Sequence, residues 1–194
     1  MGLFTRYKGK CDELLMDLMK NGDHRAFTEI YDRYASRLNA FFFRMLWSDK
    51  ELAQDCVHDL FSRIIERPSL FKDGYLLKPW LFRIAANICK NHYRKKSYEN
   101  EYLKVLNEPR IDFQKSESLI DEEIQMTQLK RHLEGLNEEL RTMFLLRYQQ
   151  ELSIKEIAAV FEIAEGTVKS RLFNTKKQLL SMLTDHPKIL EDEK

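Results

Sequence analysis

Polar side chains that suit DNA recognition recur at helical spacing near the end of the chain. Val168, Leu172 and Leu179 would face a core, because residues three, four or seven apart share one side of an α-helix. The other sides present Thr167, Lys169, Ser170, Arg171, Asn174 and Lys177. Arginine can pair with guanine and asparagine with adenine, whereas serine, threonine and lysine suit phosphates. This pattern predicts a helix that reads base sequence in the major groove, although a solvated helix face has a similar composition.

A second basic segment lies upstream. From Lys78 to Lys96 there are six lysines and arginines and no acid, although the net charge of the chain is only +1. On a helix they would join two asparagines in a polar stripe with a basic end: Arg83, Asn87, Lys90, Asn91, Arg94, Lys95 and Lys96. Such a stripe would bind phosphates in a salt-dependent way. Phe71 and Tyr75, just before it, either stack an extruded base or cap the core.

Residues with other chemistry are scattered. The three cysteines Cys11, Cys56 and Cys89 are odd in number and lack CxxC spacing, which argues against disulfides and suits a reducing compartment. The five histidines show no metal-ligand spacing, and no acid or histidine converges with a nucleophile. The sequence therefore predicts no enzyme, no cofactor and no small-molecule substrate. It also shows neither a signal core nor a spanning segment, so we expect a cytoplasmic protein without membrane insertion.

The predicted fold class of the chain is all-α. Six glycines and four prolines in the whole chain are too few for the frequent turns of a β fold. Apolar periodicity predicts helical stretches at 14–38, 51–66 and 79–95, with Pro79 in the first turn of the last one. Acids then accumulate over 98–121 and the periodicity fades, which predicts a flexible acidic linker.

The second half is predicted to be a small helical domain. Helices are expected at about 122–134 and 137–149. Ser153 and Glu156 match a capping box, and the apolar stripe that follows is separated by a tight turn from the stripe of Val168. Two short helices joined in this way form a helix-turn-helix, which favours DNA recognition over a solvated face. The predicted architecture is two small helical domains, 1–97 and 122–194, joined by the linker.

Six segments carry a family resemblance. The segments LRTMFLLRY (140–148), SIKEIA (153–158) and EGTVKSRL (165–172) resemble region 4 of the extracytoplasmic-function (ECF) sigma factors in the sigma-70 family. The segments FTEIYDRY (27–34), AQDCVHDLF (53–61) and KPWLFRIAAN (78–87) are similar to region 2 of the same proteins. They occur in the expected order and cover most of the chain outside the linker and the tails.

This resemblance implies a division of labour between the two domains. In that family, region 2 binds the clamp helices of the polymerase β′ subunit and opens the −10 element, whereas region 4 binds the β flap and reads the −35 element. Carried onto this chain, it places Asp55, His58, Asp59 and Arg63 at the clamp, the segment 71–96 at the −10 element, and the set from Thr167 to Lys177 at the −35 element. The implied partners are core RNA polymerase, promoter DNA and an anti-sigma factor that covers both domains.

Four positions depart from the family pattern. Glu162 and Ala164 stand where the family usually has a turn glycine and a capping serine. A non-glycine residue in a left-handed turn costs about 1–2 kcal/mol, and a lost cap about 1 kcal/mol, so we expect a less stable second domain with an unchanged fold. His58 replaces a frequent glutamine at the clamp, and Asn91 replaces a frequent aspartate in the −10 segment.

Other classes of protein fit the sequence less well. A two-component-type or quorum-type activator has a similar helix-turn-helix, but it needs an upstream receiver or ligand domain, and residues 1–97 show no alternating β/α pattern. A helical anti-sigma or adaptor protein would not need two basic faces.

Overall fold

The structure is a computed structural model that describes residues 7–72, 74–105, 132–133 and 135–184. All regular elements within these ranges are helical, which confirms the predicted fold class. They are α1 (Asp12–Lys20), α2 (His24–Met45), α3 (Lys50–Glu66), the 3₁₀ turn η1 (Pro68–Leu70), α4 (Leu77–Val105), α6 (Glu138–Tyr148), α7 (Ile154–Phe161) and α8 (Glu165–Thr184). Most of the predicted helix at 122–134 and most of the predicted linker lie outside the described residues; the two described positions of that helix, 132–133, are helical.

The first predicted helical stretch is two helices rather than one. Gly22 has a φ of +87°, a left-handed conformation that glycine adopts without a steric penalty, and the chain turns there between α1 and α2. The carboxylate of Asp23 then caps α2 by accepting hydrogen bonds from the amides of Arg25 at 3.0 Å and Ala26 at 3.3 Å. The apolar periodicity continued across this break, so the single stretch 14–38 was wrong.

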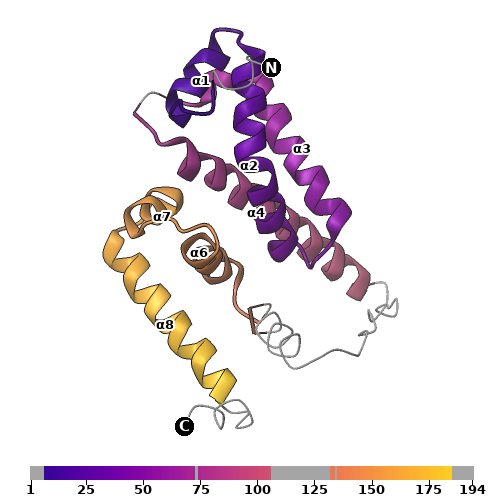
Figure 1. The fold of residues 1–194 in the computed structure, drawn as a ribbon. Coiled ribbons are helices and arrows are strands. Elements are labelled where there is room, and N and C mark those ends of the chain that lie inside the picture. Colours follow the sequence, from indigo (N-terminus) through magenta and orange to yellow (C-terminus); the bar gives the residue numbers. More distant parts are fainter. Residues whose placement is uncertain (1–6, 73, 106–131, 134, 185–194) are drawn as a thin grey trace, which may run out of the picture.

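Helices α1 to α4 form the first module, seen in the upper part of Figure 1. Its core consists of fully buried side chains such as Leu38, Phe41 and Leu60, and the Phe41 ring meets the Phe82 ring edge-on at 5.5 Å between centroids. Because α2, α3 and α4 each have one apolar side, packing these sides together leaves the polar sides outside.

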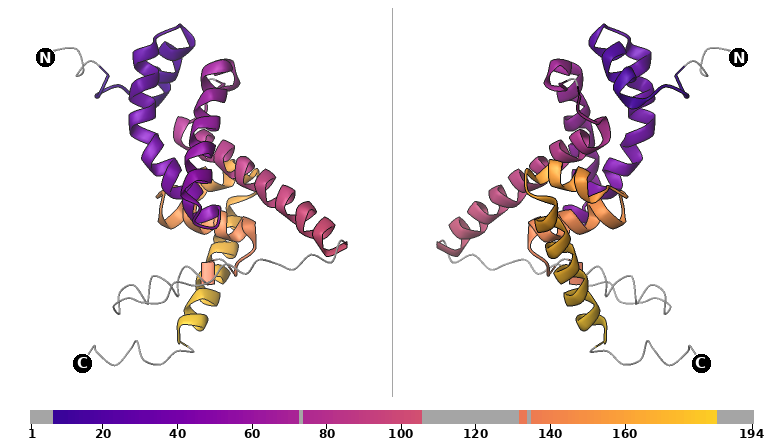
Figure 2. Two further views of the ribbon diagram at one scale, coloured as in Figure 1. Left: turned by 90° about the vertical axis from the view of Figure 1, so that its right-hand side faces the viewer. Right: turned by 90° about the vertical axis from the view of Figure 1, so that its left-hand side faces the viewer.

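Helix α4 is longer than predicted. It begins at Leu77, so Pro79 does lie in its first turn, but it continues through residues 98–105, which were assigned to the linker. Both views in Figure 2 show its C-terminal end projecting beyond the neighbouring helices. Among the described side chains of α4, Cys89 is the last that is buried, so the helical backbone continues beyond the part that packs in the core.

Helices α6, α7 and α8 form the second module. Asn137 caps α6 by accepting from the amide of Leu140 at 2.8 Å. The predicted capping box of α7 is confirmed: Ser153 Oγ accepts from the amide of Glu156 at 3.2 Å, and the Ser153 amide donates to the Glu156 carboxylate at 2.7 Å. Glu162 has a φ of +56° and adopts the left-handed conformation in the turn between α7 and α8. This agrees with the turn position to which the sequence assigned it.

The two modules pack against each other in this structure. Helices α6 and α7 lie beside α4 in Figure 1, and buried residues of both modules form one continuous core cluster. Arg37 of α2 donates to the side-chain and backbone oxygens of buried Gln150 at 3.2 and 2.9 Å. Arg83 of α4 forms an ion pair with Glu162, and both side chains remain partly exposed. The modules are therefore in direct contact here.

We predict that Glu162→Gly raises the free energy of unfolding by about 1 kcal/mol. Glycine removes the clash of a left-handed L-residue, and the exposed ion pair with Arg83 contributes little to stability. Urea denaturation measures the change. In the control, Ala159→Gly in the exposed side of α7 should lower stability by about 1 kcal/mol. Equal destabilisation by both glycines would contradict the prediction.

Candidate nucleic-acid interface

Helix α8 separates an apolar side from a polar side as the sequence predicted. Val168, Leu172 and Thr175 are buried, whereas Lys169, Ser170, Asn174 and Lys177 are exposed and Thr167 is half-buried. The hydroxyl of Ser170 donates to the Thr167 carbonyl at 3.1 Å, which satisfies it locally. The predicted recognition residues do not all lie on one side of α8. Lys169 is five residues before Asn174, so their side chains point in different directions.

Arg171 is oriented by a residue that the sequence reasoning missed. Its NH1 group forms an ion pair with the Glu139 carboxylate in the first turn of α6. The two side chains keep 36% and 49% of their surface exposed, so the pair lies at the surface beside the recognition residues. Thirty-two positions separate them in the chain, and no local pattern could have linked them.

The predicted polar stripe of α4 is present, except that Lys96 lies outside it and Tyr98 extends it. Asn87, Lys90, Asn91 and Arg94 are exposed on the side away from the core, and Arg83 lies half-buried at the start of the same stripe. The core side of the helix is formed by the buried residues Leu81, Ala85, Ile88 and Cys89.

Lys96 does not belong to this stripe. It lies two residues after Arg94, and residues two apart on a helix do not face the same way. Its ammonium nitrogen sits 3.6 Å from the centroid of the Trp47 ring, a cation–π contact that ties the helix to the turn between α2 and α3. Tyr98, four residues after Arg94 and 66% exposed, continues the stripe instead. The sequence reasoning missed Tyr98 because it ended the helix too early.

The two loop aromatics have different environments. Phe71 is only 3% exposed, packs edge-on against Trp80 at 5.2 Å between centroids, and lies beneath the ammonium group of Lys20. In this position it is a core residue and cannot stack an extruded base, so that interpretation of Phe71 was wrong. Tyr75 is 50% exposed and remains available for a stacking contact.

The polar side of α3 is open. Asp55, His58, Asp59 and Arg63 are all exposed, and the Asp59 carboxylate pairs with Arg63 at 2.6 Å. The buried side of the helix holds Cys56, Leu60 and Ile64. The structure therefore brings the four predicted residues together on one free helical face.

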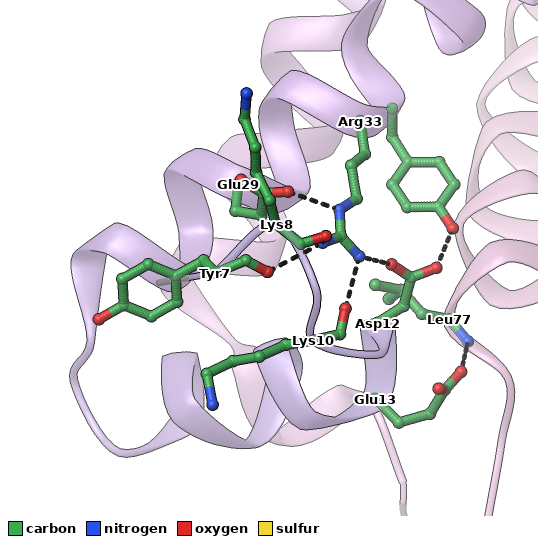
Figure 3. Close-up of polar contacts among 9 residues, drawn as sticks. Tyr7, Lys8, Lys10, Asp12, Glu13, Glu29, Arg33 and Leu77 are labelled. Carbon is green, nitrogen blue, oxygen red and sulfur yellow. Dashed lines mark hydrogen bonds and ion pairs between the residues drawn. The ribbon is translucent and has the colours of Figure 1, made fainter. Parts of the chain in front are cut away.

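A network around Arg33 of α2 holds the start of α1 and the segment before it (Figure 3). The Arg33 guanidinium donates to the carbonyls of Tyr7, Lys8 and Lys10 at 3.1, 3.2 and 2.9 Å, and pairs with Asp12 at 2.7 Å and Glu29 at 2.8 Å. Local sequence patterns could not predict this network, because most of the partners of Arg33 lie more than twenty residues away.

The same network reaches the stripe helix through Glu13. One carboxylate oxygen of Glu13 accepts from the amide of Leu77 at 3.1 Å, at the first residue of α4 (Figure 3). An amide at a helix N-terminus lacks a partner within the helix, so this contact satisfies it and places a negative charge where the helix dipole favours one. Helix α1 thus determines where α4 begins.

The buried cysteines are not poised for chemistry. Burial raises the pKa of the Cys56 thiol to about 11 and the pKa of the Cys89 thiol well above its usual value. Both thiols are therefore protonated near neutral pH and are poor nucleophiles. Within the described ranges, no group of three or more histidine, cysteine, aspartate or glutamate side chains is arranged to hold a metal ion. Among the described residues, no helix is both long enough and apolar enough to cross a bilayer.

The chain matches two family descriptions, Sigma-70 region 2 over residues 30–98 and Sigma-70, region 4 over residues 126–179. It is 28% identical over 178 residues to the RNA polymerase sigma-H factor of Pseudomonas aeruginosa, covering 87% of this chain and 91% of that protein. It is 29% identical to the ECF RNA polymerase sigma factor SigW of Bacillus subtilis, covering 86% and 94%. The ECF RNA polymerase sigma-E factor of Escherichia coli is 28% identical, with coverage of 87% and 92%.

Two solved structures have a similar fold. CnrH, in complex with the cytosolic domain of CnrY, aligns with a TM-score of 0.70 at 20% identity, covering 91% of this chain and 99% of that one. The sigma factor RpoE of Bartonella quintana, in complex with the anti-sigma factor NepR, aligns with a TM-score of 0.65 at 24% identity, covering 81% and 96%.

Two helical modules, one with a helix-turn-helix and both with polar or basic helix faces, define a DNA-binding transcription protein. The order of the two matched regions, together with relatives that align over most of their length, identifies the family. The chain belongs to the ECF sigma factors of the sigma-70 family, which direct RNA polymerase to promoters and initiate transcription there.

We predict that Arg33→Lys lowers the free energy of unfolding by about 2 kcal/mol or more. Lysine carries a point charge and cannot reproduce the planar set of donors that serves three carbonyls and two carboxylates. Thermal unfolding followed by circular dichroism measures the loss. Arg25→Lys, at an exposed position of α2, should change stability by less than about 0.5 kcal/mol. A similar small effect at Arg33 would show that the network does not stabilise the module.

Proposed function

We propose that α8 reads the −35 element of the promoter. The support is the exposure of Asn174 and Lys177, with Arg171 half-buried beside them, on a helix whose opposite side, at Val168 and Leu172, is buried. Arg171 and Asn174 are suited to base edges, and Ser170, Lys169 and Lys177 to the sugar-phosphate backbone around them. The left-handed turn at Glu162 sets the angle at which α8 leaves α7.

The stripe of α4 contacts the −10 element. From Arg83 to Arg94 it extends about 16 Å along the helix, and Tyr98 lengthens it by one further turn. Arg94, Lys90 and Lys95 supply charge for phosphates, whereas Asn87 and Asn91 can bond to base edges. Tyr75, in the loop before α4, provides an exposed ring for an unstacked base.

The free face of α3 docks on the clamp helices of the polymerase β′ subunit, and the second module contacts the β flap. The exposure of Asp55, His58 and Asp59 beside a fully packed apolar side supports the first assignment. Family membership supports the second. It also supports a cytoplasmic site of action and control by an anti-sigma factor, the kind of protein found with the sigma factor of Bartonella quintana.

The contact between the two modules keeps one residue of the stripe, Arg83, from binding DNA. In the arrangement described here, Arg83 of the stripe is paired with Glu162 of the second module. Arg83 therefore has to leave Glu162 before it can reach DNA. Movement of the second module away from α4 on polymerase would release it, and interfaces between domains of one chain commonly allow such motion.

We predict that Arg171→Ala weakens transcription from a cognate promoter about five-fold or more, because a good bidentate contact to a base is worth about 1–3 kcal/mol. Run-off transcription and promoter binding with core polymerase measure the loss, while binding to core polymerase should stay unchanged. Lys155→Ala, at an exposed position of α7, serves as the control. Equal promoter occupancy by the Arg171 variant would remove this residue from the reading face.

We predict that Asp55→Arg weakens binding to core polymerase about ten-fold or more without unfolding the first module. The residue is exposed, and a reversed charge at the centre of a docking face is strongly unfavourable. Fluorescence anisotropy of the labelled chain with core polymerase measures the affinity. Asp32→Arg makes the same charge change at an exposed position of α2 and should have little effect. If both variants bind equally well, α3 is not the docking helix.

A further inference from the structure

Glu139 is an acidic residue at a surface that has to approach DNA. Its carboxylate pairs with NH1 of Arg171, the arginine proposed above to read a base. An acid so close to the phosphate backbone is unfavourable by charge alone, since it repels the DNA. Its contact with Arg171 suggests a specific role in the complex.

The backbone beneath Glu139 is firmly placed. Asn137 caps α6 by accepting from the Leu140 amide at 2.8 Å, so Glu139 lies in a capped first turn. Met143 and Leu146, further along α6, are fully buried, and α6 packs directly against α8. The distance between the origins of the two side chains is therefore set by the module core rather than by the ion pair.

The contact leaves a binding edge of Arg171 for DNA. A guanidinium carries five N–H donors in a planar fork, and Glu139 engages it through NH1. The edge formed by Nε and NH2 presents two parallel donors, the arrangement that matches O6 and N7 of guanine. Glu139 and a guanine can therefore hold Arg171 at the same time.

We propose that Glu139 is a positioning residue that holds Arg171 in the orientation needed to read guanine in the −35 element. This inference rests on the proposed role of Arg171 and adds the residue that determines its selectivity. Held through NH1 by Glu139, the free edge of Arg171 points in one direction, whereas an unpaired Arg171 could turn toward any nearby phosphate. Glu139 therefore favours the cognate complex over binding to unrelated duplex DNA.

The test compares Glu139→Gln with the matched variant Glu165→Gln. Glu165 is an exposed acid at the N-terminus of α8, so its replacement removes the same charge from the same module without touching Arg171. Affinity is measured for a cognate promoter fragment with core polymerase bound, and for an unrelated duplex of about 30 base pairs with the full chain alone. Urea unfolding of each variant is followed in parallel.

Glu139→Gln should weaken cognate binding about three- to ten-fold and leave binding to the unrelated duplex unchanged or slightly tighter. Glu165→Gln should shift both affinities together, in the direction of tighter binding, because repulsion from the backbone falls. In an Arg171→Ala background, Glu139→Gln should cause no additional loss, because the residue acts through Arg171. Unfolding should be little affected, since the ion pair is exposed.

Two results would overturn the inference. If Glu139→Gln tightened binding to both DNAs by the same factor as Glu165→Gln, Glu139 would be a repelling charge only. An additional loss in the Arg171→Ala background would mean that Glu139 acts through another group. If Arg171→Ala itself left promoter binding unchanged, the proposed role of Arg171 would fail, which is a separate outcome.

Discussion

The amphipathic period of α4 is the constraint on which the structure depends. Leu81, Phe82 and Ala85 are fully buried and hold the helix against the first module, and the side that remains outside carries the stripe. Each residue advances the helix by about 100°, so one inserted residue within α4 would rotate the stripe relative to the core. The contact of Glu13 with the first amide of α4, and the packing of Phe71 beneath Lys20 and against Trp80, determine the register from which this period starts.

The same helix also receives the second module. Arg141 of α6 donates to the hydroxyl of Tyr93 at 2.8 Å, and Arg37 holds Gln150 through its side chain and its carbonyl. These contacts are polar, and several of them are only partly buried. Contacts of this kind exchange readily for water, so they fix the geometry of the interface, whereas the core cluster shared by the two modules stabilises it.

Local sequence signals predicted the fold well wherever a local interaction determines it. The cap at Ser153, the apolar period of α3 and the left-handed turn at Glu162 each depend on a few neighbouring residues, and each was confirmed. The break at Gly22 was missed because the apolar period happened to continue across it. The extension of α4 was missed because acidic residues suggest a linker, although they are also compatible with a solvated helix.

The candidate site was predictable as a set of faces but not as a set of contacts. The exposed residues of α3, α4 and α8 follow directly from helical period. Phe71 is buried by contacts with Trp80 and with Lys20 of α1, about fifty residues upstream. The contact of Lys96 with Trp47 likewise joins residues that are far apart in the chain. Apart from Glu29, which lies four residues before Arg33, the partners of Arg33, Arg83 and Arg171 come from distant segments that no spacing rule in the sequence relates.

Glu162 illustrates how two small free energies can have different consequences. Its left-handed backbone costs about 1–2 kcal/mol, whereas an exposed ion pair such as the one with Arg83 contributes only about 0–1 kcal/mol. The pair does not offset the strain, so stability of the turn gives no reason for a glutamate there. The strain is present whether or not the modules touch, because the turn belongs to the second module alone. The ion pair exists only while the modules are in contact, so the side chain at position 162 biases the balance between the touching and separated arrangements.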